Sequence, residues 1–156
     1  MSRAIPGIHH VTAITGNPQQ NLDFYTGVLG LRLVKLTVNF DDPGAYHLYY
    51  GDAVGHPGTI LTFFAWPGAP GGRPGTGQVG VTSLAIPQGA LEYWHERLSK
   101  QSVPVQGLSQ RFGEQVRQAE TDVERGIAEV DDFVVKQNES AVADEDVLWT
   151  EVAMDE

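Results

Sequence analysis

The chain has no cysteine among its 156 residues. This absence excludes disulfides, thiolate zinc sites and catalysis by a cysteine nucleophile. Long hydrophobic runs are also missing, because no apolar segment approaches the roughly 18 residues that a membrane-spanning helix needs. The first residues show no basic segment followed by an apolar stretch and a cleavage site. We therefore expect no membrane partner and no secretory signal, and we take the cytoplasm as the compartment.

Positive charge is scarce and the charges are unevenly spread. The chain carries 10 Lys and Arg against 20 Asp and Glu, a formal net charge of −10. Residues 1–113 hold six acidic and seven basic side chains, whereas residues 114–156 hold fourteen and three. A near-neutral body with an acidic end offers no basic stripe for DNA or RNA, so we expect no nucleic-acid partner. The length favours a single domain with its own core.

The first 66 residues carry the pattern of strand, helix and three strands. Alternating apolar residues predict the strands, and Asn17-Pro18 and Gly30 are typical of a helix start and a helix end. The expected elements, in this order, are residues 5–15, 17–30, 31–40, 46–50 and 59–66.

A Gly- and Pro-rich linker, residues 67–77, separates this unit from a second one. The second unit begins with a strand at Val79–Ile86 and continues with a helix from Pro87 and a strand at Val103–Phe112. The segments "LDFY" and "LEYW" stand at matching places in the two units, which indicates internal repetition. The sequence thus predicts one module over residues 1–113, with units at about 5–66 and 78–113.

Residues 114–156 form an acidic tail with a different pattern. Apolar residues recur there at steps of three and four, which predicts an amphipathic helix over residues 114–135, followed by irregular chain. The residues in this series are Val116, Ala119, Val123, Ile127, Val130 and Val134.

Two adjacent histidines, His9 and His10, open the first apolar run. Successive strand side chains point to opposite faces, so only one imidazole can face a given cavity. We expect His10, with Thr12 and Ile14, on the concave side of the sheet, and His9 against the helices. A histidine on an inner sheet face is a natural ligand for a divalent metal. The alternative for His10 is an imidazole that is simply hydrogen-bonded within the sheet.

Four segments together resemble one protein superfamily. They are "GIHHVTAITGNPQQNLDFYTGVLGLRLVK", "YHLYYGDAVGHPGTILTFFAWP", "SLAIPQGALEYW" and "RFGEQ". They resemble the vicinal oxygen chelate superfamily of glyoxalases, bleomycin-resistance proteins and extradiol dioxygenases, and within it the ring-cleaving dioxygenases of hydroquinone-type phenols. The resemblance implies an α+β fold in which paired βαβββ units curve into a cup. A full-length dioxygenase of this type has two such modules, so it is about twice this length.

The resemblance implies Fe(II)-dependent cleavage of a dihydroxylated aromatic ring by O2. His10 matches the metal-binding histidine of a 2-His-1-carboxylate site, and the other two ligands belong to a C-terminal module. Another divalent metal is the alternative to iron, and we expect the site to be incomplete in this chain alone. Glu129, in "GIAEV", is a weaker match to a ligand glutamate. Aromatic side chains on the strands point alternately to the two faces of the sheet, so a subset of them can line a pocket. Our candidates for the substrate pocket are Tyr46, Tyr50, His56 and Phe63.

Two other functions remain open for the same fold. One is a metal-dependent, glyoxalase-like lyase or isomerase, and the other is a metal-free homodimer that binds small molecules. The segment "VGVTSLAI", where the resemblance would place an equivalent ligand, holds no histidine and favours the binding protein. The match of several motifs in order favours the dioxygenase. We expect a complete iron site to need a C-terminal module, because the edge that a second copy of the chain would bring near His10 offers no imidazole.

Overall fold

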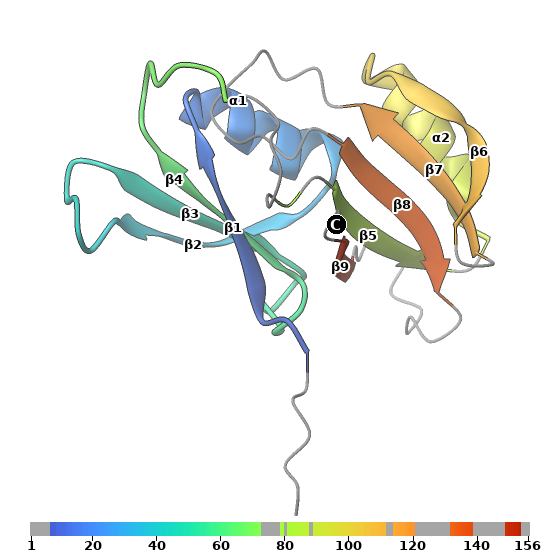
Figure 1. Ribbon diagram of the computed structural model, residues 1–156, viewed down its shortest axis with the longest axis horizontal. Helices are drawn as coiled ribbons and strands as arrows, with labels where there is room; N and C mark the ends of the chain where they lie inside the picture. Colours follow the sequence, from blue (N-terminus) through green and yellow to red (C-terminus); the bar gives the residue numbers. More distant parts are fainter. Residues whose placement is uncertain are drawn as a thin grey trace, which may run out of the picture.

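The computed structural model describes residues 7–72, 79, 81–87, 89–111, 114–120, 132–138 and 149–153. The first unit folds as one strand, a helix and three strands (Figure 1). Its elements are β1 (His10–Thr15), α1 (Pro18–Leu22), η1 (Asp23–Val28), β2 (Arg32–Val38), β3 (Tyr46–Gly51) and β4 (Ile60–Ala65). The strand order is β1-β4-β3-β2, with β1 parallel to β4 and the other pairs antiparallel. This confirms the predicted βαβββ unit.

The second unit repeats this topology. Its elements are β5 (Val81–Pro87), α2 (Leu91–Lys100), β6 (Val105–Arg111), β7 (Glu114–Glu120), β8 (Asp132–Asn138) and β9 (Trp149–Ala153). In the sheet order β6-β7-β8-β5-β9, β5 is parallel to β8 just as β1 is parallel to β4. Strand β9 is added antiparallel at the other edge of β5. The paired βαβββ architecture is therefore confirmed.

The helix predicted over residues 114–135 is wrong for the residues that the structure describes there. Residues 114–120 form β7, and residues 132–135 lie in β8. The apolar residues at helical spacing come from two separate strands, whose backbone groups are paired with neighbouring strands rather than along a helix. The boundary expected after residue 113 accordingly falls inside the second sheet. Residues 121–131, including Glu129, lie outside the described part of the chain.

The first helix begins and ends where the sequence predicted. The Asn17 side chain accepts a hydrogen bond from the Gln20 N–H (3.1 Å), and Pro18 occupies the first turn. The helix then widens into the π-helical turn η1, where the Leu29 N–H donates to the Phe24 carbonyl five residues earlier (3.0 Å). Gly30 follows with φ +72°, the left-handed conformation that glycine adopts readily at a helix end.

Both units contribute to one hydrophobic core. Leu48, Tyr50, Leu61 and Phe63 of the first sheet belong to the same buried cluster as α2 and β5 residues of the second unit. The residues from the second unit are Leu84, Ile86, Leu91, Trp94 and Leu98. Burial of apolar side chains from both units stabilises their association. No helix among the described residues is long and apolar enough to cross a membrane.

Candidate functional site

The two faces of the first sheet have different surroundings. On one face, Val11 and Ala13 of β1 pack against the hydrophobic core. His10, Thr12 and Ile14 alternate with them and so point to the opposite side. His10 is exposed on this side, which we call the His10 face, and its orientation agrees with the one predicted from alternation.

Strand register brings residues far apart in the sequence into two rows across the His10 face. Strand pairing aligns Thr12 with Thr62, Thr62 with Tyr49, and Tyr49 with Lys35. The next row aligns Ile14, Phe64, His47 and Thr37. The first row is tied together where the Thr62 hydroxyl donates to the Thr12 hydroxyl oxygen (2.9 Å). Together the rows form a surface of hydroxyls and aromatic rings beside His10.

The aromatic part of this surface is built around His47. Its ring centre lies 4.1 Å from that of Tyr49 and 4.0 Å from that of Phe64. The His47 Nδ1 atom shares a hydrogen bond with the Tyr49 hydroxyl (2.9 Å). Burial lowers the pKa of His47, and the electrostatic influence of the neighbouring His10 and Lys35 side chains lowers it further. His47 therefore favours the neutral imidazole, which suits an apolar, stacked surface.

His9 contacts His10 directly. Their Nδ1 atoms lie 3.1 Å apart, and the rings meet edge to face with centres 5.2 Å apart. One Nδ1 donates and the other accepts. In the arrangement in which the His10 Nδ1 donates, the Nε2 atom of His10 is the unprotonated nitrogen, which is the form that a metal ligand needs. His9 is exposed and precedes β1, so strand alternation does not govern it and the expected packing of His9 against the helices is wrong.

The loop after β3 supports the end of the strand that carries these histidines. The Gly58 N–H donates to the His9 carbonyl oxygen (2.8 Å). Within the loop, Asp52 Oδ1 accepts from the backbone N–H groups of Val54, Gly55 and His56, and Oδ2 contacts His56 Nδ1 (2.5 Å). Burial alone would raise the pKa of Asp52, but the hydrogen bonds from His56 and the backbone outweigh it and lower the pKa.

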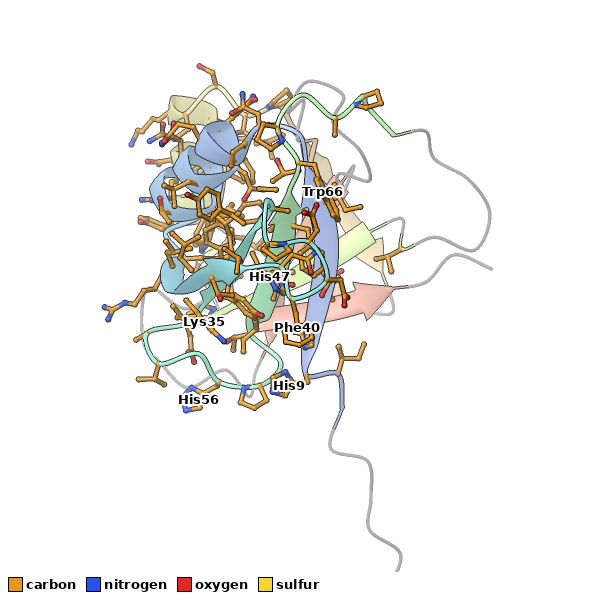
Figure 2. All side chains as sticks on the ribbon, turned by 90° about the vertical axis from the view of Figure 1, so that its left-hand side faces the viewer. His9, Lys35, Phe40, His47, His56 and Trp66 are labelled. Carbon is orange, nitrogen blue, oxygen red and sulfur yellow. The ribbon has the colours of Figure 1, made fainter. Side chains whose placement is uncertain are left out.

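The other predicted site residues lie away from the His10 face. Tyr50 and Phe63 are 0% and 3% exposed in the core, on the opposite side of the sheet. Tyr46 is exposed at the start of β3 and shares the side of Tyr50, and His56 lies in the loop next to the His9 end of the sheet (Figure 2). The structure therefore does not bring these four residues together with His10 into one pocket.

Sequence reasoning missed His47, Tyr49, Phe64 and Lys35 as members of one surface. Strand alternation separates Tyr49 from Tyr50 and Phe64 from Phe63, but it does not tell which set the helices cover. The structure settles the question by burying Leu61 and Leu48, since side chains that alternate with them face the other way.

The described residues do not make a complete iron site. A 2-His-1-carboxylate site requires three converging protein ligands. Among the described side chains, no group of three or more His, Asp or Glu residues is arranged to hold a metal ion. His10 can supply one donor, so a second histidine and a carboxylate would have to come from elsewhere.

Known proteins of similar sequence include several dioxygenases. A Bacillus subtilis protein named "Putative ring-cleaving dioxygenase MhqO" is 62% identical over 115 residues, which are 74% of this chain and 36% of that protein. The chlorohydroquinone/hydroquinone 1,2-dioxygenase of Sphingobium indicum is 40% identical over 112 residues, 70% of this chain and 35% of the enzyme. The chain thus spans about a third of the length of the curated relatives that it matches.

Solved structures share the fold. A crystal structure of a "putative dioxygenase" from Bacillus subtilis is 54% identical, with a TM-score of 0.77, and the match covers 85% of this chain and 41% of that one. The fosfomycin resistance protein FosX from Listeria monocytogenes shares the fold at 10% identity, with a TM-score of 0.58 and coverage of 92% and 100%. The family model of the Glyoxalase/Bleomycin resistance protein/Dioxygenase superfamily matches residues 7–124. The chain belongs to this superfamily.

Proposed function

We propose that the chain is one module of a ring-cleaving dioxygenase that acts on a dihydroxylated aromatic with Fe(II) and O2. The observation that carries this proposal is the 40% to 62% identity to relatives named as ring-cleaving dioxygenases. Identity of this extent over more than 100 residues is high enough for side-chain positions of a site to be shared. Since the chain spans about a third of those relatives, the complete activity belongs to a larger assembly, formed with a C-terminal module or a second copy.

In this proposal His10 is the metal donor that the chain contributes. Its ring is exposed at the start of β1, beside the aromatic surface, and the contact with His9 orients it through Nδ1. A neutral imidazole held by a second group at its other nitrogen is the usual arrangement of a ligating histidine. The second histidine and the carboxylate would be supplied by the other part of the assembly.

The surface formed by His47, Tyr49 and Phe64 suits a flat aromatic substrate. The ring centres of Tyr49 and Phe64 lie 4.1 Å and 4.0 Å from the ring centre of His47. The Lys35 ammonium lies 5.1 Å from the centre of the Tyr49 ring, so a positive charge stands at the edge of the surface. Such a charge favours a phenolate over a neutral phenol. The chain would therefore orient the ring and stabilise a deprotonated hydroxyl.

Anaerobic titration of the purified chain with Fe(II), followed by oxygen uptake with hydroquinone, tests this proposal. We expect weak iron binding, loss of that binding in His10→Ala, and little turnover by the chain alone. His56→Ala is the matched control, because it removes an exposed imidazole at the same end of the sheet. Iron binding that is unaffected by His10→Ala would refute the role of His10. Tight stoichiometric iron with turnover would show that the chain is a complete enzyme.

A metal-free binding protein is the second candidate function. It is favoured because no group of three or more His, Asp or Glu residues within the described part of the chain is arranged to hold a metal ion. Calorimetric titration with hydroquinone in the presence of EDTA, together with the mass in solution, distinguishes the metal-free binding protein from the dioxygenase module. Hydroquinone binding by a dimer without metal would favour the binding protein, whereas metal-dependent binding would favour the dioxygenase.

A further inference from the structure

The aromatic surface of the His10 face continues beyond Phe64 to Trp66. Trp66 follows β4, and its N–H donates to the Thr15 carbonyl (2.9 Å), so the pairing of β1 with β4 extends to this residue. Its side chain therefore lies on the same side of the sheet as that of Phe64, and the two ring centres are 5.7 Å apart. With His47 and Tyr49, these rings form a continuous line, which we call the aromatic row. All four side chains are partly exposed.

The Trp66 ring is held in place at the end of the aromatic row. Its Nε1–H donates to Asp42 Oδ2 (2.9 Å), and Asp42 Oδ1 accepts from the Gly44 N–H in the loop between β2 and β3 (3.2 Å). The indole is thus oriented by a hydrogen bond and by its contact with Phe64. A ring that is already ordered loses little side-chain entropy when a ligand packs against it.

The aromatic row leads away from His10 along the strands. Through the pairing of β1 with β4, Phe64 lies four residues along the strands from the level of His10, and Trp66 lies two residues further. At about 3.3 Å per residue, these positions are roughly 13 Å and roughly 20 Å from that level. Figure 2 shows the same direction, because His47 lies between Trp66 and His9.

A single dihydroxylated ring is shorter than this row. When a hydroxyl of such a ring meets a metal at His10, the ring reaches only the level of Tyr49, two residues along the strands. Phe64 and Trp66 then have no contact with it. A substituent on the ring would cover them, and burial of its apolar surface against these two rings would strengthen binding.

Charge at the far end of the aromatic row limits the chemistry of such a substituent. The Asp42 carboxylate lies there, bound to the indole N–H of Trp66. Lys35 lies at the other end, with its ammonium 5.1 Å from the Tyr49 ring centre. An anionic substituent would approach the negative charge of Asp42, so the arrangement favours an apolar one.

We propose that this site takes hydroquinones that carry an apolar, ring-sized substituent, and that the substituent lies on Phe64 and Trp66. The inference rests on the proposed function, because it places the dihydroxylated ring beside His10. Lys35 and Tyr49 contact that ring, whereas Phe64 and Trp66 determine the preference for the substituted substrate.

NMR titration of the 15N-labelled chain with phenylhydroquinone, in anaerobic buffer without added metal, tests this inference. Contact of the substituent with the aromatic row does not require the metal. The indole N–H of Trp66 reports on the end of the row, and its signal is identified by its loss in Trp66→Leu. We expect this signal to shift with phenylhydroquinone but not with hydroquinone, and phenylhydroquinone to bind at least about tenfold more tightly because it buries more apolar area. A phenylhydroquinone with a carboxylate on its second ring should bind at least about threefold more weakly than phenylhydroquinone itself.

Two substitutions locate the contact. Phe64→Leu removes one ring without touching the hydrogen bond between Trp66 and Asp42, and Trp66→Leu removes the other ring. Each should weaken phenylhydroquinone binding at least about threefold. Tyr93→Leu is the matched control, because it removes an exposed aromatic ring from α2, outside the aromatic row, and it should leave the affinity unchanged.

Equal affinity for hydroquinone and phenylhydroquinone, a Trp66 signal that does not move, or full binding by Phe64→Leu would overturn the inference. A Trp66 signal that shifts with protein concentration instead would show that the aromatic row is an interface between copies of the chain, and it would also overturn the inference. The dioxygenase proposal depends on iron binding at His10 and on oxygen uptake. Neither enters this titration, so failure of one proposal is distinguishable from failure of the other.

Discussion

The Nδ1 atoms of His9 and His10 lie 3.1 Å apart, so the first histidine fixes the ring of the second. Because this hydrogen bond needs one protonated and one unprotonated Nδ1, it couples the tautomer of His10 to that of His9. We predict that His9→Ala changes the tautomer populations of His10 while the free energy of unfolding stays within about 0.5 kcal/mol, since His9 is exposed. Long-range 1H–15N NMR spectra of the imidazoles measure the first effect. Unchanged His10 resonances in His9→Ala would contradict the orienting role.

Tyr50 anchors the first helix to the sheet through a buried hydrogen bond. Its hydroxyl donates to Asn21 Oδ1 (2.8 Å), and burial, followed by the charge of Asp23, raises the pKa of Tyr50 so that the hydroxyl keeps its proton. Tyr50→Phe leaves the amide oxygen of Asn21 without this donor and should cost about 1–3 kcal/mol in urea unfolding. Tyr46→Phe, at an exposed tyrosine of the same strand, is the control and should cost less than about 0.5 kcal/mol. Equal effects of the two substitutions would argue against the buried bond.

Arg97 links α2 to the end of η1, across the two units. Arg97→Met keeps the apolar stem over Trp94 but removes the donors to the Gly27 and Val28 carbonyls. We expect the free energy of unfolding to fall by about 1–2 kcal/mol. The loss is smaller than for hydrogen bonds of a fully buried charged group, because the guanidinium is partly exposed. Lys100→Met provides the comparison on the same helix and should change stability by no more than about 0.5 kcal/mol. A loss in Lys100→Met as large as that in Arg97→Met would show that the cross-unit bonds contribute nothing specific.

Asp52 should make the stability of the chain depend on pH in acid. Its folded-state pKa lies below the ordinary value of 3.8, so the ionised carboxylate stabilises the fold. This contribution is fully present above about pH 3.8 and is lost as the pH falls through the lower folded-state pKa. Unfolding free energies of the chain and of Asp52→Asn, measured from pH 6 downwards, should therefore converge in acid. If the difference in unfolding free energy between the two proteins stays constant below the ordinary pKa, the ionised carboxylate is not the source of the stabilisation.

The strand and helix order of the first unit could be predicted because local signals mark each boundary. Asn17-Pro18 starts the helix, Gly30 ends it, and alternation sets each strand. The second unit was predicted only as far as β6. In β7, most side chains are polar, so apolar periodicity is a poor guide there and pairing with β6 and β8 decides the structure.

Of the candidate site, the sequence predicted the orientation of one residue, His10, but not which side chains surround it. Alternation places His10 opposite Val11 and Ala13, which needs no knowledge of other strands. Membership of the aromatic surface depends on strand register, since His47 meets Phe64 only through the pairing of β3 with β4. The pocket candidates Tyr50 and Phe63 were misassigned for the same reason: which face the helices cover is a tertiary property.

The most direct test of the central claim is a chimera with the Sphingobium indicum chlorohydroquinone/hydroquinone 1,2-dioxygenase. The segment of that enzyme that aligns with this chain over 112 residues is replaced by the matching residues of this chain, and the product is loaded with Fe(II). Oxygen uptake with hydroquinone is then measured for the chimera and for its His10→Ala variant. If His10 is a ligand of a ring-cleaving site, the chimera turns hydroquinone over, and His10→Ala lowers both iron content and turnover by at least about a hundredfold. Turnover by the His10→Ala chimera at the rate of the unsubstituted chimera would contradict the account.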